Sequence, residues 1–395
     1  MIARLCYPSS KLKTTDHLRR YDLYETDKDK IYRYLDKLHK TQKRTVQQIS
    51  YAHTLKILNN NISIVFYDVT TLYFEIKEED ELRKTGFSKD GKAQNPQIVL
   101  GLLVSTGGYP LAYEIYKGNK FEGDTMLPVI NLFKRKYKLK KLVIVADAGL
   151  LSAKNIESLL KNNYEYILGA RIKNEAAEIK EQILALSLKN GDNAVINKND
   201  GSRLIVSYSK ARAQKDSHNR QRGISKLEKQ VKANRLTKAQ INNKGYNRFL
   251  KMTGEINVSI DKTKILLDKK WDGLKGYVTN PVLSKEEVIE NYGHLWSIEK
   301  AFRISKTDIQ IRPVYHHLQR RIEAHICIAF VAYKVYKELE RQLHELKSFL
   351  SPEKAIEIAK TIYSIKAQKP KSKEIIDRMM LLNDEQRLLA NLFDF

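Results

Sequence analysis

The sequence predicts a mixed α/β protein built around a sheet, and three observations support this. Apolar runs rich in β-branched and aromatic residues recur between residues 62 and 170, and such runs are typical of strands. Stretches with helical spacing of apolar residues separate the later runs. Their order is strand, strand, strand, helix, strand, helix, strand, which is the pattern of a mixed sheet with helices packed on it.

The composition indicates a folded protein with a polyanionic partner. Of 395 residues, 42% are hydrophobic, enough for a core. There are 71 Lys and Arg against 46 Asp and Glu, a net charge of +25, which points to nucleic acid or an anionic membrane surface. The longest apolar run, residues 98–104, is too short to span a bilayer, and no signal-peptide pattern opens the chain. Cys6 and Cys327 lack metal-ligand or CxxC spacing, so we expect a soluble protein of a reducing compartment.

Residues 1–60 are expected to form a small helical N-terminal region. Two charged segments, 27–38 and 45–58, favour helix. A Lys-rich region of this kind either contacts DNA or is simply solvated, and the sequence leaves both possibilities open.

The sheet region begins at Ile62. Residues 62–75, 97–105 and 110–116 are three apolar runs, the last two joined by a Gly107-Gly108 turn, and together they predict a meander. A helix over 125–136, a strand over 142–146, a helix over 153–161 capped by Ser152 and a strand over 164–170 follow.

Two aspartates stand out in this region. Asp68 falls inside or at the end of the first strand, and Asp147 follows the strand 142–146. A carboxylate in a hydrophobic strand is costly to bury unless it is paired or bound to a metal, although an Asp at a strand end can also cap its own turn. Because groups at the carboxyl ends of neighbouring strands converge on one crevice, we expect the two side chains to lie close together.

A third carboxylate lies in the stretch Tyr292–Lys306, which we predict to be one helix. Two seven-residue steps, from Tyr292 to Glu299 and from Glu299 to Lys306, are each about two helical turns, so the three residues should share a face. Ser284 and Glu287 offer a capping box upstream. Such a stripe on a helix is often only solvated and paired within itself.

The three carboxylates together suit a metal site. Asp68 and Asp147 on adjacent strands, joined by Glu299 from a packed helix, would give the oxygen-only ligands that Mg2+ or Mn2+ prefers.

At these motifs the chain resembles a known family. Asp68 in YDVTT, Asp147 in VADAGLLS and the stretch YGHLWSIEKAFRISK, in this order, are similar to the DDE transposases of bacterial insertion sequences. The branch is the one whose third acidic residue lies in a Tyr-x2-Arg-x3-Glu-x6-Lys signature. The resemblance covers about residues 60–340 and implies a ribonuclease-H-like core, whose strand order agrees with the order predicted above.

The resemblance implies a role for each motif residue. Asp68, Asp147 and Glu299 would be the catalytic triad that binds Mg2+ or Mn2+, as two ions, while Tyr292 and Lys306 would contact DNA phosphates. Trp296 would hold a distorted or unstacked base at the transposon end. The signature's Arg position is Leu295 here, which cannot bind a phosphate. Arg303, one turn after Glu299 on the same face, could take over that role.

The resemblance also explains the long interval between Asp147 and Glu299 as a β-rich insertion. Short strands are predicted there over 194–197, 203–209, 256–260, 263–267 and 273–279. Between the second and third of them, residues 210–251 form a polar helical stretch with 13 Lys or Arg against two acids, a net charge of +11. This concentration indicates phosphate binding without base readout, although a solvated basic arm remains an alternative.

The last part of the chain is predicted to be helical. Residues 318–346 show a core-facing apolar stripe, and 350–395 read as amphipathic helices that pack on the catalytic domain or a second protomer. His316, His317 and His325 lack metal-ligand spacing, so structural or DNA-contacting roles are favoured over metal binding. The expected divisions are a helical region 1–60, the two core parts 61–170 and 284–346, a basic insertion 171–283 and C-terminal helices 347–395.

We therefore expect a transposase that cleaves transposon ends and transfers them to target DNA by metal-dependent phosphoryl transfer. The family implies a bacterial, cytoplasmic, nucleoid-associated protein that acts as a homodimer on DNA and has no membrane partner. Two alternatives stay open: a nuclease of the same fold that does not join strands, and an inactive or domesticated remnant that only binds DNA, which Leu295 makes more plausible.

Overall fold

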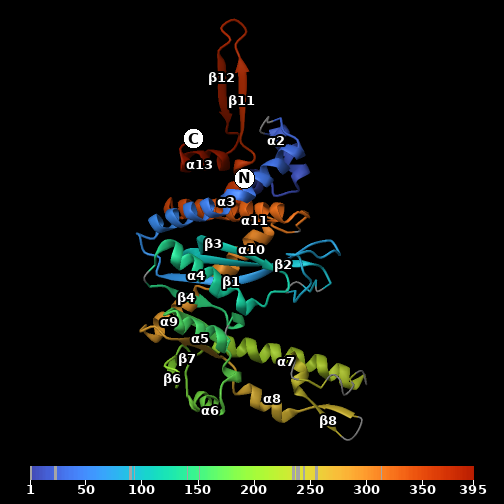
Figure 1. Ribbon diagram of the computed structural model, residues 1–395, viewed down its shortest axis with the longest axis vertical. Helices are drawn as coiled ribbons and strands as arrows, with labels where there is room; N and C mark the ends of the chain where they lie inside the picture. Colours follow the sequence, from blue (N-terminus) through green and yellow to red (C-terminus); the bar gives the residue numbers. More distant parts are fainter. Residues whose placement is uncertain are drawn as a thin grey trace. The chain divides into compact units, whose positions relative to one another are not determined.

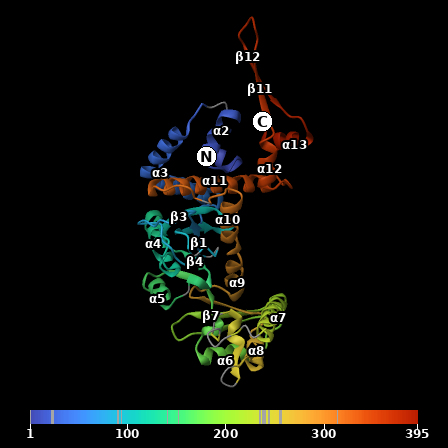
Figure 2. The same cartoon turned by 90° about the vertical axis from the view of Figure 1, so that its right-hand side faces the viewer.

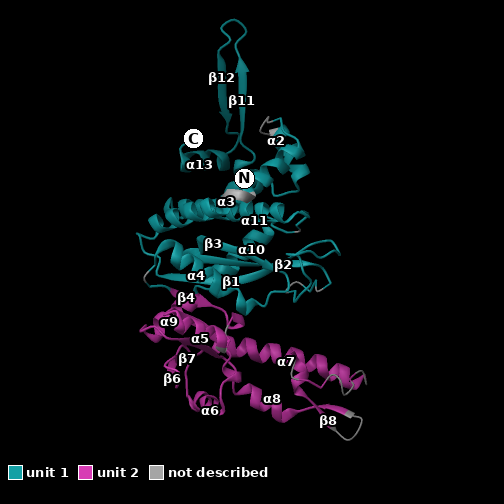
Figure 3. Ribbon diagram, viewed as in Figure 1, with its two compact units in different colours: residues 1–142, 294–395 teal, residues 143–293 magenta. Residues whose placement is uncertain are grey.

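The chain folds into two units, and the strands predicted from the sequence are divided between them. In this computed structural model, unit 1 comprises residues 1–142 and 294–395, and unit 2 comprises residues 143–293 (Figure 3). The structure describes residues 2–21, 25–88, 91–92, 94–139, 141–150, 152–233, 236, 241–242, 245–253, 257–312 and 314–395. Within these ranges, no helix combines the length and the apolar composition needed to cross a bilayer.

The centre of unit 1 is the predicted meander. Strands β1 (Ile64–Tyr73), β2 (Gln97–Ser105) and β3 (Pro110–Lys117) pair antiparallel in this order. The β2–β3 connection reverses direction at Gly107 and Gly108, which both have φ +79°, a conformation open to glycine but strained for other residues. The run of apolar residues in β2 is buried along its whole length, as expected for a strand covered on both faces.

Helices cover both faces of the meander (Figures 1 and 2). Helix α4 (Met126–Tyr137) packs against β2 and β3, and α10 (Trp296–Thr307) packs against β1 and β2 on the other side. The long helices α3 (Lys28–Ile57) and α11 (Gln319–Glu345) pack on each other and on β3. Asp27 caps α3, since its carboxylate accepts the Lys30 N–H. The two N-terminal helices predicted from sequence are thus one continuous helix.

The ends of unit 1 add smaller elements. Helices α1 (Ile2–Cys6) and α2 (Lys11–Tyr21) precede α3, and α1 contacts α11. After α11, helices α12 (Pro352–Ala359) and α13 (Asp384–Phe393) share an apolar cluster with Leu343 and Leu350. Between them lies a feature that the helical prediction missed, a two-stranded hairpin of β11 (Tyr363–Gln368) and β12 (Ile375–Met380). Its side chains are largely exposed, and Figure 1 shows it extending away from α13.

Unit 2 contains a five-stranded arrangement in the order β4 (Val143–Ala146), β5 (Glu165–Ala170), β10 (Leu274–Thr279), β7 (Arg203–Tyr208), β6 (Asn193–Asn197). Strands β4 and β5 are parallel, and the others pair antiparallel. Helix α5 (Ala153–Lys161) joins β4 to β5, and Ser152 caps it as predicted. Helix α9 (Lys285–Gly293) packs on β4, β5, β6 and β10, so its apolar side completes the core of this unit.

The described part of region 171–283 contains five strands, β6 to β10, as many as the sequence predicted, but one of them lies elsewhere and helices replace part of the expected pattern. Helix α6 (Ala177–Ala185) was not predicted, and the strand expected over 263–267 is wrong, because helix α8 (Lys262–Lys269) occupies it. The Asp261 carboxylate accepts the N–H groups of Thr263 and Lys264, which fixes this helix start. The predicted strand over 256–260 is observed as β9 (Asn257–Ile260), paired with the unpredicted β8 (Leu250–Thr253).

The basic stretch 210–251 is only partly a single helix. Helix α7 (Lys210–Lys232) forms its first half, and a short 3-10 helix, Gly245–Phe249, leads into β8. A small apolar cluster of Ile224, Leu227, Phe249 and Leu250 holds α7 against these elements. The predicted basic residues Arg235, Lys238 and Lys244, like Ile256 of the predicted strand, lie outside the described residues. The mixed α/β prediction is confirmed, whereas the ribonuclease-H-like assignment stays a prediction.

Candidate active site and nucleic-acid interface

Asp68 lies in the middle of β1 rather than at its end. It pairs with Leu102 of β2, and the strand continues to Tyr73 because Val69–Tyr73 form five further pairs with β2. Of the two placements that the sequence left open for Asp68, the one inside the strand is confirmed. The side chain is half-buried, and its Oδ1 accepts the Val69 N–H at 2.7 Å.

Strand alternation shows which face of the meander Asp68 occupies. Val99 of β2 pairs with Thr71 of β1 on one side and with Tyr116 of β3 on the other, so Thr71 and Tyr116 point to the same face of the meander. The Tyr116 hydroxyl donates to the carbonyl of Thr125, the residue at the start of α4, which identifies this face. Thr71 therefore lies on the α4 face of the meander. Because neighbouring side chains in a strand point to opposite faces, Asp68 lies on the α10 face.

Glu299 is presented by α10 on the same side of the meander as Asp68. The helix buries Ser297, Ile298, Ala301, Phe302 and Ile304, which form its core-facing side. Glu299 and Arg303 are exposed, and Lys306 is half-buried. The spacing Glu299, Arg303, Lys306 follows a single face of an α-helix, so one carboxylate and two cations line α10 together.

Asp147 follows β4 directly, as predicted, and belongs to unit 2. Its exposed carboxylate accepts the Gly149 N–H at 2.9 Å, and its carbonyl accepts the Leu150 N–H at 3.1 Å. These bonds form the short turn that leads toward α5. They hold the Asp147 backbone in a fixed orientation at the end of a buried strand.

The single helix predicted over Tyr292–Lys306 is wrong. Helix α9 ends at Gly293 and α10 begins at Trp296, and a tight turn through His294 and Leu295 separates them. The helix ends here because glycine is a poor helix-interior residue and a common helix terminator. The charge spacing that predicted one continuous helix does not register this effect of Gly293. The capping box at the start of α9 is confirmed, because Ser284 and Glu287 bond each other's backbone N–H groups.

The break separates Tyr292 from the rest of the motif. Tyr292 is only 8% exposed and lies in unit 2, where its ring packs edge-on against Tyr277 with centroids 4.8 Å apart. The Lys275 ammonium lies 4.5 Å from the ring centroid of Tyr292. The common helix face expected for Tyr292, Glu299 and Lys306 is thus wrong for Tyr292, while Glu299 and Lys306 keep it.

Two neighbours of Glu299 have opposite exposure. Trp296 is 56% exposed, and the Lys300 ammonium lies 5.9 Å from its ring. Leu295, at the signature's Arg position, is 7% exposed and precedes the first turn of α10. The leucine at this position therefore contributes to the core. An exposed aromatic ring such as that of Trp296 is suited to stacking on a base.

The chemistry of these carboxylates fits a hard divalent cation. Asp68, Asp147 and Glu299 offer oxygen ligands only, which suits Mg2+ or Mn2+. Within the described ranges, no group of three or more His, Cys, Asp or Glu side chains is close enough to hold a metal ion. Asp68 and Glu299 belong to one unit and Asp147 to the other, so the joint triad stays a prediction.

A basic surface runs along α7 in unit 2. Seven of its cations are exposed: Lys210, Arg212, Lys215, Arg222, Lys226, Lys229 and Lys232. Arg220 is the exception, with a side chain only 6% exposed and both terminal nitrogens bonded to the Asp272 carboxylate at 2.5 Å. A bidentate buried pair of this kind fixes the rotation of the helix about its axis.

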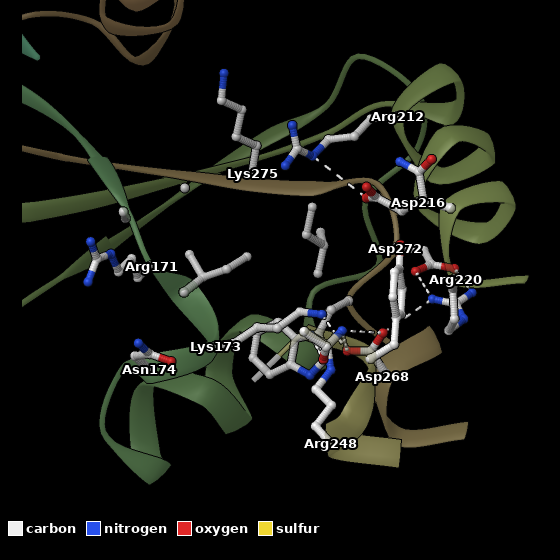
Figure 4. Close-up of a pocket in the computed structure, with 18 residues that line it drawn as sticks. Arg171, Lys173, Asn174, Arg212, Asp216, Arg220, Arg248, Asp268, Asp272 and Lys275 are labelled. Carbon is white, nitrogen blue, oxygen red and sulfur yellow. Dashed lines mark hydrogen bonds and ion pairs between the residues drawn. The ribbon is translucent and has the colours of Figure 1, made fainter. Parts of the chain in front are cut away.

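Arg220 belongs to a larger ion-pair network around a cavity of about 650 Å3 (Figure 4). The Asp268 carboxylate forms ion pairs with Lys173 at 2.6 Å, Arg248 at 3.2 Å and Arg220 at 3.4 Å. These cations lower the pKa of the Asp268 carboxyl even though burial acts to raise it. Carboxylates thus balance the inner cations, whereas the outer cations of α7 remain available to an external polyanion.

Sequence reasoning missed one group of basic residues altogether. Arg4 is 8% exposed and lies 3.3 Å from the Nε2 atom of His325, which is 5% exposed. The two residues are separated by 321 positions, and no local pattern connects them. The only available signal was the set of histidines 316, 317 and 325, for which the sequence left structural and DNA-contacting roles open.

Comparisons with known proteins identify the family. The model of the family described as Transposase DDE domain matches residues 59–334. No curated protein matches. Among solved structures, a piggyBac transposase synaptic complex with hairpin DNA is 9% identical, with 91% of this chain and 77% of that chain covered and a TM-score of 0.43.

Two structures of the Mos1 transposase are also similar over a smaller part. A paired-end complex with the left transposon end is 12% identical, with 40% of this chain and 53% of that chain covered and a TM-score of 0.20. A mariner paired-end complex with Mn is 14% identical, with 40% and 54% covered and a TM-score of 0.19. These TM-scores do not establish a shared fold. The family match, which spans most of the chain, does establish membership: the protein belongs to the transposases with a DDE domain.

Proposed function

We propose that this protein cleaves DNA at transposon ends and joins those ends to target DNA by metal-dependent phosphoryl transfer. The observation that carries the proposal is the family match together with Asp68 and Glu299 on the same side of the meander in unit 1. Asp147, at the end of β4, would complete the triad. No Ser, Cys or Tyr nucleophile is required for this chemistry.

Asp68, Asp147 and Glu299 would hold Mg2+ or Mn2+, as two ions. When bound, such ions activate water or a 3′-hydroxyl and stabilise the leaving oxygen. The protein's own contribution is to hold the carboxylates in place: β1 fixes Asp68 through its pairing with β2, and the turn at Gly149 fixes Asp147. This rigid support reduces the rearrangement needed when the ions and the substrate bind.

The residues beside Glu299 would bind the DNA. Arg303 and Lys306 lie on the same face of α10, where their charges would hold phosphates near the carboxylate. Trp296 would stack on a base displaced at the transposon end. A phosphate contact by Tyr292 stays a prediction, and its burial means that it would need to move to reach DNA.

The basic face of α7 would supply sequence-independent affinity. Its exposed cations lie on one long helix held by the buried Arg220 pair. Such a face binds the phosphate backbone and positions the duplex without reading bases. A homodimer in the DNA complex, a bacterial cytoplasmic location and association with the nucleoid are further parts of this proposal.

A strand-cleavage and strand-transfer assay tests the proposal. The substrate is DNA that carries the element's own ends, with Mg2+ or Mn2+, and the variants are wild type and Glu299→Gln. We expect metal-dependent cleaved and joined products from wild type, and a loss of at least about a thousandfold in Glu299→Gln, because the amide cannot balance the metal charge. Glu290→Gln, a carboxylate change on the neighbouring helix α9, is the matched control and should keep activity.

Two alternatives correspond to defined outcomes of this assay. Cleavage without joined products would favour a nuclease. Binding without any product would favour a remnant that only holds DNA, an alternative supported by the buried Leu295 at the signature's Arg position. Unchanged products from Glu299→Gln would remove Glu299 from the triad.

A further inference from the structure

A second cavity, of about 470 Å3, lies wholly in unit 1, beside α1, the start of α2 and the segment that follows α10. Its lining is strongly basic, and no Asp or Glu is among the described residues that form it. The cationic and imidazole groups are Arg4, Lys11, Lys13, Arg312, His316 and His325. This contrasts with the cavity of unit 2, where three aspartates balance the cations.

Arg4 carries a buried charge, and no carboxylate is among its hydrogen-bond partners within the described ranges. Its guanidinium donates to the carbonyls of Ser9 at 2.8 Å and Gln310 at 2.6 Å. Its Nε atom is buried and has no hydrogen-bond partner among the described residues. Carbonyl oxygens orient a guanidinium but leave its charge unbalanced, and an unbalanced buried charge is costly.

Two histidines adjoin Arg4 in this cavity. The rings of His316 and His325 are 5.4 Å apart, and Nε2 of His325 lies 2.9 Å from the Ile311 carbonyl. Nδ1 of His325 is buried and has no partner in the described part of the chain. Burial, and then Lys11 and other nearby cations, lowers the pKa of His316 to about 4. Burial also lowers the pKa of His325, so both rings are neutral at pH 7 and carry one N–H each. His325 donates its N–H from Nε2 to the Ile311 carbonyl, so His316 is the ring that can donate to a bound group.

The start of α2 adds further positive potential. Lys11 and Lys13 stand in its first turn, where the Ser10 hydroxyl accepts the Lys13 N–H at 3.2 Å. Burial, followed by repulsion from Arg4, lowers the pKa of Lys11 to about 8. The positive end of the helix dipole lies at the same place. Every charge here repels the others, so an anion would stabilise all of them.

We infer that this cavity binds a phosphate group, and that a DNA strand supplies it. Phosphate matches the site because its several acceptor oxygens can be shared among guanidinium, ammonium, imidazole and helix N–H donors. Tyr315 also lines the cavity and is 66% exposed, and an exposed aromatic ring beside a basic groove is typical of single-stranded nucleic-acid sites. The choice of DNA as the carrier rests on the proposed function, whereas the phosphate site does not.

Thermal unfolding tests the phosphate site. Melting temperatures of wild type and Lys11→Gln are compared in sodium phosphate and in sodium chloride of equal ionic strength. Lys37→Gln is the matched control, because Lys37 is exposed on α3 in the same unit and does not line the cavity. Lys11 is preferred to Arg4, whose bonds to two carbonyls also support the fold.

We expect phosphate to raise the melting temperature of wild type and Lys37→Gln equally, and to raise that of Lys11→Gln by less than half as much. An equal rise in all three proteins, or no rise in wild type, would overturn the phosphate site. This readout needs no DNA, so it stands even if the proposed transposase function fails.

Fluorescence anisotropy with single-stranded oligonucleotides tests the carrier. At about 0.1 M salt, we expect Lys11→Gln to bind roughly fivefold to tenfold more weakly than Lys37→Gln, with the salt slope of log K reduced by about one. Tyr315→Ala should weaken binding as well while it keeps the phosphate-induced rise in melting temperature. If Lys11→Gln and Lys37→Gln bind the oligonucleotides equally, the proposal that DNA supplies the phosphate is overturned, and free phosphate is the ligand of this cavity.

Discussion

Lys11 shows how a half-buried cation can limit stability when no anion balances it. Its pKa in the folded chain is about 8, against 10.5 for an unperturbed lysine, because of burial first and Arg4 second. Below pH 8 both the folded and the unfolded chain carry the charge, so the cost of burying it is fully present. Between pH 8 and 10.5 the folded chain loses its proton first, and the cost disappears.

The prediction from Lys11 concerns a difference between two proteins. In phosphate-free buffer at pH 7, the free energy of unfolding of Lys11→Gln should exceed that of wild type by on the order of 2 kcal/mol. Because glutamine also changes local packing, the decisive quantity is the change with pH: this advantage should shrink steadily from pH 8 to 10.5. Denaturant titrations across this range measure it, and a difference that stays constant would contradict the lowered pKa.

Leu295 illustrates the opposite case, an apolar residue at a position where the family signature has a cation. Because it is 7% exposed beside the first turn of α10, Leu295→Arg would place a charge in the core. We expect a loss of about 2–4 kcal/mol in the free energy of unfolding, against less than about 1.5 kcal/mol for the volume-matched Leu295→Met. Chemical denaturation of both variants checks this, and equal stabilities would show that the site accepts a charge.

At the scale of elements, α7 offers the clearest electrostatic test. Arg222, Lys226 and Lys229 are exposed at helical spacing, so they form one strip of charge. Their joint change to glutamine should reduce the salt slope of log K for DNA by about two to three and weaken binding to all sequences alike. The charge-preserving triple Arg222→Lys, Lys226→Arg, Lys229→Arg is the control. An unchanged slope in the glutamine variant would assign this helix to solvation.

Elements defined by local chemistry could be predicted from the sequence. The β2 strand and the Gly107-Gly108 turn follow from apolar runs and glycine conformation, and the starts of α5 and α9 follow from Ser152 and from Ser284 with Glu287. The failures have equally local causes. Gly293 ends a helix that charge spacing alone seemed to continue, and Asp261 starts a helix where β-branched residues suggested a strand.

At the scale of the whole molecule, the candidate sites depend on contacts that no local pattern encodes. The triad could be proposed because each acid lies in its own recognisable motif. The basic cavity could not, because Arg4 and His325 come together only through the packing of α1 against α11. A single sequence does not distinguish a buried arginine whose charge is paired with a carboxylate, such as Arg220, from one whose charge is not, such as Arg4.

The whole chain also separates DNA binding from chemistry. With a net charge of +25, binding should depend on phosphates and salt and not on a bound metal. Removal of divalent ions with EDTA at fixed ionic strength should therefore leave DNA affinity unchanged and abolish cleavage, and added Mg2+ should restore it. Gel-shift and cleavage assays on the same samples measure both, and a parallel loss of binding would show that the ions also hold the DNA.

The β11–β12 hairpin of unit 1 has a consequence for how this chain can change over evolutionary time. It is a sheet of only two strands with largely exposed side chains, so it can open and re-form while the meander stays intact. Substitutions in it therefore cost the fold little. Residues 363–380 can therefore accept substitutions and acquire new contacts more freely than β1–β3, where substitutions of the buried side chains lower the free energy of unfolding.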